Sequence, residues 1–178
     1  MKNPNFSNKK LSTGDGENHE FSHINLVQFF SPAMGIVVNV PDNWVEESSD
    51  SIFQVSDPVT GTQFTASAFQ NPGLSFDKWT FMRLSMVEEG MPYLREVRGP
   101  YPFKAKTWAN FAAEYEGRFP EKNEDSRYVV LCMHTDKMLI SFTVVANAKV
   151  YAANEALYTW LLQNHLEIYD VIRVKQEG

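Results

Sequence analysis

The sequence has one cysteine, no long apolar run and no excess of positive charge, and each of these absences excludes a class of protein. A lone Cys132 cannot form an intramolecular disulfide or a cysteine-based zinc site. No stretch approaches the ~20 apolar residues that a membrane-spanning helix needs, so we expect no membrane span. The net charge of −6 repels phosphate backbones, so we expect no nucleic-acid partner.

Sequence motifs for catalysis are also missing. The chain has no Gly-rich phosphate loop, no G-x-S-x-G nucleophile elbow and no H-E-x-x-H zinc motif. His19 and His23 stand in a polar segment where nothing would hold a metal in place, and Cys132 lies in an apolar strand-like run typical of a core residue. We therefore expect no cofactor and no metal, and the missing motifs favour a non-enzymatic protein over an enzyme of unfamiliar type.

The length and composition indicate one globular domain after a short arm. The chain has 178 residues, of which 43% are hydrophobic, enough to build a core without disulfides or metals. Residues 1–22 are polar and rich in Gly, Asn and Ser, which predicts a flexible arm before a single domain over residues 23–178. Because residues 1–11 contain no apolar signal-peptide core, we expect a cytoplasmic protein.

The first half of the chain reads as four strands and a helix. The strands are expected over residues 24–31, 35–40, 52–56 and 62–69, with Pro41 ending the second and a turn at Asp57-Pro-Val-Thr-Gly61 joining the last two. Ser75 is a natural helix N-cap, and Gly90 followed by Pro92 predicts the helix end. Helical spacing predicts a core stripe of Phe76, Trp79, Met82, Met86 and Val87.

The second half repeats this order. Strands are expected over residues 93–97, 108–119, 127–134 and 139–146, with a proline-containing loop over 98–106, and a closing helix over 148–166. Alternation along 108–119 predicts one solvated face, on which Glu114 and Glu116 would serve solubility. The closing helix carries a core stripe and beside it a second, aromatic ridge of Tyr151, Tyr158, Leu162 and His165. The ridge either lies under a neighbouring loop or forms a patch that meets a partner or a second copy.

Two segments give the chain a family likeness: Gly35-Ile-Val-Val-Asn-Val-Pro-Asp-Asn-Trp44 and the Asp57–Gly61 turn. With the order ββββ-α-ββββ-α, they resemble the PsbP-like superfamily, which includes extrinsic photosystem II subunits, a Ran-binding nuclear import factor and DcrB-type bacterial proteins of unknown function. The resemblance implies an α+β fold with a central antiparallel sheet between flanking helices, an α/β/α sandwich. It also implies that Trp44 packs over the end of the sheet. It implies no catalytic residues, because the superfamily shares none.

Two functions remain open. The first is a non-enzymatic interaction or accessory module that binds another protein, or a second copy, through the ridge of Tyr151, Tyr158, Leu162 and His165. The second is a small-ligand binder or unfamiliar enzyme with a pocket near Arg83, Tyr93, Arg95 and Trp108; Arg83 would either lie over the core or bind an anion. A deep cleft with a buried charged group would favour the ligand, whereas a shallow surface with an exposed aromatic would favour the partner.

Overall fold

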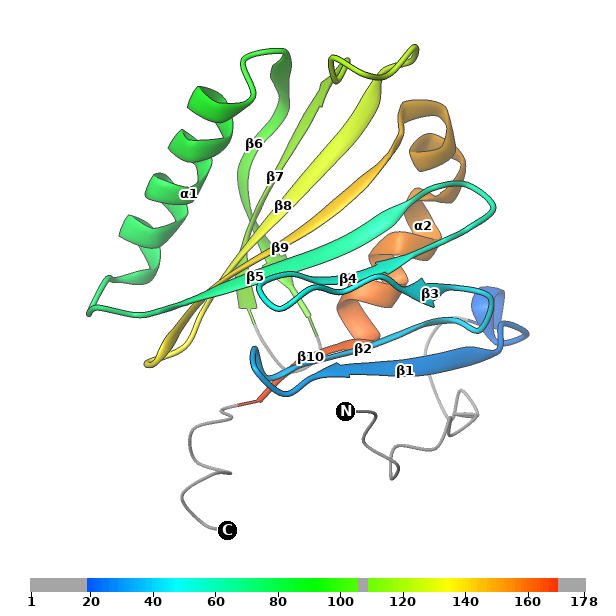
Figure 1. Ribbon diagram of the computed structural model, residues 1–178, viewed down its shortest axis with the longest axis horizontal. Helices are drawn as coiled ribbons and strands as arrows, with labels where there is room; N and C mark the ends of the chain where they lie inside the picture. Colours follow the sequence, from blue (N-terminus) through cyan, green and yellow to red (C-terminus); the bar gives the residue numbers. More distant parts are fainter. Residues whose placement is uncertain (1–18, 106–108, 170–178) are drawn as a thin grey trace, which may run out of the picture.

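The computed structural model describes residues 19–105 and 109–169, drawn in colour in Figure 1. Ten strands, two α-helices and one 3-10 turn follow one another in these parts of the chain. Their order is η1 (His19–Phe21), β1 (Leu26–Ser31), β2 (Ile36–Pro41), β3 (Val45–Glu46), β4 (Phe53–Ser56), β5 (Gln63–Gln70), α1 (Phe76–Gly90), β6 (Leu94–Lys104), β7 (Ala109–Gly117), β8 (Ser126–His134), β9 (Met138–Asn147), α2 (Ala148–Asn164) and β10 (Leu166–Ile168).

The strands form two antiparallel sheets rather than one. The large sheet has the order β3-β4-β5-β9-β8-β7-β6, and the small sheet has the order β1-β2-β10. Helix α1 covers one face of the large sheet, while α2 and the small sheet lie on the other face (Figure 1). The predicted α+β fold with flanking helices is confirmed, and the second sheet is an addition to it.

Local chemistry explains the turn and the tryptophan in the first half. The Asp57 carboxylate accepts hydrogen bonds from the Val59 N–H at 2.9 Å and the Thr60 hydroxyl at 2.8 Å. Gly61 closes the turn with a φ of 76°, which only glycine adopts freely. Trp44 is 4% exposed and meets the Phe64 ring edge-on at 4.9 Å, so its predicted place over the sheet is confirmed.

Helix α1 begins and ends where the sequence predicts, but its buried face is different. The Ser75 hydroxyl accepts a hydrogen bond from the Lys78 N–H, and the helix ends at Gly90. Trp79, Thr80, Leu84 and Val87 are its buried residues, whereas Met82 and Met86 are 40% and 49% exposed. Each residue turns the helix by about 100°, and around the helix axis both methionines lie outside the arc of buried residues, on the side of Trp79. Their assignment to the core stripe is therefore wrong.

Strand β6 replaces most of the loop expected over residues 98–106. Pro100 and Pro102 suggested a loop because proline cannot donate a hydrogen bond within a sheet. β6 is instead the edge strand beside β7, and an edge tolerates proline on its open side. Its pairing with β7 shifts register between Glu96 and Arg98 and again between Arg98 and Tyr101.

Helix α2 is buried on more than one side, so its aromatic ridge, the candidate interface, lies in the interior, the other of its two predicted places. Tyr151, Tyr158 and Leu162 are 7%, 2% and 4% exposed. They belong to one core cluster with residues of both sheets, because α2 packs against the large sheet and the small sheet at once. Phe21, which the sequence places in the flexible arm, also packs here, with its ring 5.3 Å from that of Trp160. Residues 1–18 of that arm lie outside the described residues.

Candidate functional site

A groove of about 370 Å³ runs between helix α1 and the edge strand β6, and we call it the α1–β6 groove. Along this edge β6 has β7 as its only strand neighbour in the described parts of the chain. The groove is lined by Asp77, Thr80, Phe81, Leu84, Ser85, Glu88, Glu96, Pro100 and Phe111. These residues combine an apolar floor with an acidic rim.

The floor of the groove is aromatic. Phe111 of β7 is half-buried, and its ring stacks on that of Phe76 with 5.2 Å between the centroids. Leu84 is buried beneath it, whereas Phe81 is 75% exposed at the side of the groove. A phenylalanine exposed to this extent beside other apolar groups is a typical feature of a recognition surface.

The rim carries three exposed carboxylates, those of Asp77, Glu88 and Glu96. None of them forms an ion pair with any residue in the described ranges. Glu88 lies in the last turn of α1, where the helix dipole is negative and no basic residue is present. The Glu96 carboxylate lies beside Gly99, because a Cβ on that glycine would be 2.8 Å from Glu96 Oε1.

Two buried hydroxyl groups near the groove have no hydrogen-bond partner within the described residues. They belong to Thr80, which is 6% exposed and lines the groove, and to Tyr115, which is 1% exposed. Burial first, and then the charges of Glu88 and Glu96, raise the pKa of Tyr115 to about 12. The carboxylates of Glu88 and Glu96 therefore both lie close enough to Tyr115 to raise the pKa of its hydroxyl.

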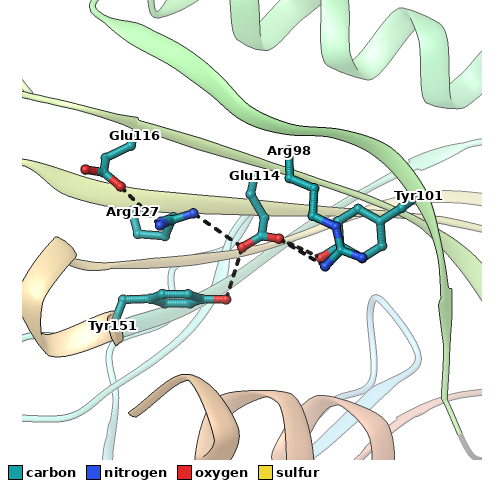
Figure 2. Close-up of polar contacts among 6 residues, drawn as sticks. All are labelled: Arg98, Tyr101, Glu114, Glu116, Arg127 and Tyr151. Carbon is teal, nitrogen blue, oxygen red and sulfur yellow. Dashed lines mark hydrogen bonds and ion pairs between the residues drawn. The ribbon is translucent and has the colours of Figure 1, made fainter. Parts of the chain in front are cut away.

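A second polar cluster lies on the opposite face of the sheet, around Glu114 (Figure 2). Glu114 Oε2 accepts a hydrogen bond from the Tyr101 hydroxyl at 3.1 Å and lies 3.7 Å from Arg98 Nη1. Its Oε1 lies 3.5 Å from both Arg127 Nη1 and the Tyr151 hydroxyl. The carboxylate thus joins strands β6, β7 and β8 to helix α2.

The Glu114 cluster corrects the expectation that this face of β7 is solvated. Glu114 is 4% exposed and Asn110 is 3% exposed, and Tyr151 of α2 contacts the Glu114 carboxylate on this face. Burial is the main reason why the pKa values of Tyr101 and Tyr151 are raised, with the charge of Glu114 next. The carboxylate is occupied by internal partners, so we interpret the cluster as a structural clasp.

Three of the four residues proposed for a ligand pocket are described, and each makes separate contacts. The Arg83 guanidinium donates to Ser141 Oγ at 2.8 Å and to the Tyr128 hydroxyl at 3.3 Å. The Tyr93 ring packs 5.2 Å from that of Phe119. Arg95 lies on the other face of the sheet from Arg83, since its neighbour Leu94 packs with the α1-side core. Trp108 lies outside the described residues.

His165, the last member of the predicted ridge, lies just after α2 and is half-buried. Its ring packs edge-on against Trp160 at 4.6 Å, and its Nδ1 lies 3.4 Å from Asn39 Nδ2. The four ridge residues therefore contribute to the interior and its margin. A partner reaches Tyr151, Tyr158 and Leu162 only if the core opens.

The groove residues were missed because no single stretch of sequence contains them. Asp77 to Glu88 come from α1, Glu96 and Pro100 from β6, and Phe111 from β7. One signal was available: Phe81 falls outside the predicted stripe of its helix, as an aromatic residue that the core does not use.

Comparison with known proteins identifies the fold. No protein-family model matches the sequence, and no curated protein matches it at a significant level. Solved structures do match: the chain has the PsbP-like fold, as the sequence resemblance implied.

Three of these structures define the likeness. Cyanobacterial PsbP (CyanoP) from Synechocystis sp. PCC 6803 aligns with a TM-score of 0.58 and 10% identity over 86% of this chain and 98% of its own. The Saccharomyces cerevisiae Ran-binding protein Mog1p aligns with a TM-score of 0.56 and 11% identity, over 82% and 96%. A Bacteroides thetaiotaomicron protein aligns with a TM-score of 0.54 and 16% identity, over 80% and 48%. Such identities establish the fold alone.

Two further features hold for the residues that the structure describes. Among them, no group of three or more His, Cys, Asp or Glu side chains is arranged to hold a metal ion. Neither of the helices is both long and apolar enough to span a bilayer.

Proposed function

We propose that this protein is a non-enzymatic accessory module that binds another protein through the α1–β6 groove. The observation that carries the proposal is Phe81, 75% exposed beside an apolar groove at the open edge of the large sheet. Large aromatic side chains at the centre of an interface contribute much of the binding energy in protein complexes. A shallow groove with an exposed aromatic is the arrangement that favours a protein partner over a small ligand.

The contacts of the other candidate residues support the same choice. The Arg83 guanidinium donates hydrogen bonds to Ser141 and Tyr128, and the Glu114 carboxylate contacts four neighbouring side chains. These groups are engaged in holding the domain together, whereas the groove carboxylates and Phe81 are open to solvent. The Ran-binding protein Mog1p has the same fold, which is a precedent for a protein partner on this scaffold.

Site-specific photocrosslinking tests the proposal. Phe81 is replaced by p-benzoylphenylalanine in the full chain, in the cells that express it, and Val59 is replaced in a matched control. Val59 is 82% exposed in the β4–β5 turn, away from the groove residues in sequence and structure. We expect position 81, and not position 59, to give a discrete adduct whose protein component is identified by mass spectrometry.

Binding of that purified protein is then measured directly. Phe81→Ser should weaken its affinity at least about tenfold, which is about 1.4 kcal/mol, while Val59→Ser leaves it within about twofold. Equal adducts from both positions, or an affinity that Phe81→Ser does not change, would contradict the proposal.

A further inference from the structure

We infer that the α1–β6 groove takes a basic, apolar segment of its partner. In this arrangement a large apolar side chain packs against Phe81 and Phe111, and Lys or Arg side chains pair with Asp77, Glu88 and Glu96. The inference rests on the proposed function, since it assumes that the groove binds a protein. It adds the chemistry of the segment that is bound.

The charges around the groove lack partners of opposite sign. Asp77, Glu88 and Glu96 are exposed, and no Lys or Arg in the described ranges pairs with them. Glu88 is also in an unfavourable place, because a carboxylate at the C-terminal end of a helix faces the negative end of the dipole. A cationic side chain from a partner would relieve both the repulsion among the carboxylates and the conflict with the helix dipole.

The groove also has an unused hydrogen-bonding group. Thr80 lines it, is 6% exposed, and has a hydroxyl without a hydrogen-bond partner among the described residues. Buried polar groups are usually paired, so an unpaired one beside a groove is consistent with a partner that supplies the missing bond. This observation is independent of the acidic rim.

The edge of β6 indicates how the segment is recognised. Pro100 and Pro102 lack N–H groups, and the pairing of β6 with β7 shifts register twice in this region. These features are typical of edges protected against the addition of another strand. Recognition therefore depends on side chains that enter the groove rather than on main-chain pairing along β6.

Charge also argues against a second copy of this chain as the occupant. A two-fold interface brings the same surface of each copy together, so the acidic rims would face each other. Repulsion between like charges that face each other would weaken association of the two copies, and each copy carries a net charge of −6. A partner with positive charge does not meet this repulsion.

The first experiment is a selection from random peptides, in which the sequence of the bound segment is not fixed in advance. The biotinylated full chain is used to select binders from a phage-displayed library of random peptides, with Phe81→Ser as the counter-selection target. We expect the selected peptides to combine Lys or Arg with Leu, Phe, Trp or Tyr. Selected peptides without basic residues would overturn the inference.

The affinity of the best peptide, labelled with fluorescein, is then measured by anisotropy against two matched variants. Glu88→Gln/Glu96→Gln should weaken binding about tenfold. Glu46→Gln/Glu121→Gln removes the same charge from exposed sites outside the groove and should change affinity less than about twofold. Equal losses in the two variants would show non-specific attraction to an acidic protein and overturn the inference.

Two other occupants are tested, the first by the same anisotropy assay and the second by analytical ultracentrifugation. An Arg173→Gln/Lys175→Gln variant that binds the peptide about tenfold more tightly would show that the chain's own Val171–Lys175 segment competes for the groove. A dimer in analytical ultracentrifugation that Phe81→Ser dissociates would show a second copy there. Either result overturns an external basic segment.

The outcomes separate the two levels of the proposal. If Phe81→Ser weakens binding of the crosslinked protein but Glu88→Gln/Glu96→Gln does not, the groove is an interface and only the inferred chemistry of the bound segment fails. If Phe81→Ser does not change the affinity for that protein, the proposed function itself fails.

Discussion

The main chain of Tyr93 lies directly against Gly117, so that a Cβ on the glycine would overlap the Tyr93 carbonyl oxygen. Gly117 is the last residue of β7, and it pairs with Leu94 at the start of the edge strand. The glycine is needed here for close approach of two main chains. This contact fixes where β6 begins beside β7, and so fixes one side of the groove.

Gly117→Ala should therefore destabilise the fold severely. The backbone cannot move aside as a flexible side chain can, so we expect a loss of at least about 2–3 kcal/mol, in the range of overpacked cores. Urea unfolding measures it. Gly90→Ala is the matched control, since a Cβ there meets nothing within 4 Å. Similar midpoints for both variants would contradict the close contact.

Trp44→Ala should remove a central part of the core. The indole is 4% exposed and packs edge-on against Phe64 of β5, so its loss leaves a cavity beside that ring. Large-to-small changes of this kind cost about 3–5 kcal/mol in chemical unfolding. A loss below about 1 kcal/mol would show that Trp44 is not packed as described.

Glu114→Ala should weaken the clasp between the large sheet and α2. Removing one member of a buried ionic cluster costs about 3–5 kcal/mol, and we expect the lower end because Arg98 and Arg127 reach solvent. Asp125→Ala breaks the exposed Arg118–Asp125 pair and should cost less than about 1 kcal/mol. Equal losses of stability in the two variants would show that Glu114 is solvated, as the alternation along β7 predicted.

Stability should fall at alkaline pH. Burial raises the pKa of Cys132, ordinarily 9.0, and of Tyr115, ordinarily 10.0, to about 12 in each case. The unfolded chain then releases these protons first, so the stability is fully present below about pH 9 and is lost as the pH rises toward 12. Urea titrations between pH 7 and 10.5 measure the slope.

The thiol's share of this slope can be isolated. Cys132→Ala should make the fall between about pH 8.5 and 10 less steep, whatever its effect on stability at pH 7. An unchanged slope in this variant would mean that the thiol ionises equally in both states. Native Cys132 should also remain unreactive toward a thiol reagent at pH 8, because the thiolate is the reactive form.

Glu88→Gln should stabilise the isolated protein slightly. It removes a negative charge from the C-terminal turn of α1, which lacks a basic residue, for an expected gain of about 0.3–1 kcal/mol. Thermal unfolding at low ionic strength measures the gain, which should shrink with added salt. A loss of stability would mean that Glu88 already has a favourable partner in the free protein.

Much of the fold was predictable from short stretches of the chain. The Asp57–Gly61 turn, the Ser75 cap and the helix end at Gly90 depend on contacts within a few residues, and all three are confirmed. The order of elements and the position of Trp44 together indicated the PsbP-like fold. Local backbone preferences carry the turn, the cap and the helix end, whereas the fold was implied by the resemblance to the PsbP-like superfamily.

Burial of whole faces was less predictable, because it depends on what packs against them. Alternation along β7 predicted two faces correctly but could not show that α2, which follows much later, covers Glu114. The aromatic ridge on α2 was visible, but not the small sheet that buries it.

The sequence by itself determined the turns and the caps, since these arise from interactions between near neighbours, and its resemblance to the PsbP-like superfamily indicated the class of fold. Only the tertiary structure decided which charged and aromatic groups face water. Phe81 and Glu96 come from separate elements, and they share a groove only because β7 and β8 place β6 beside α1. Such a surface is set by long-range packing, which no local pattern in the chain records.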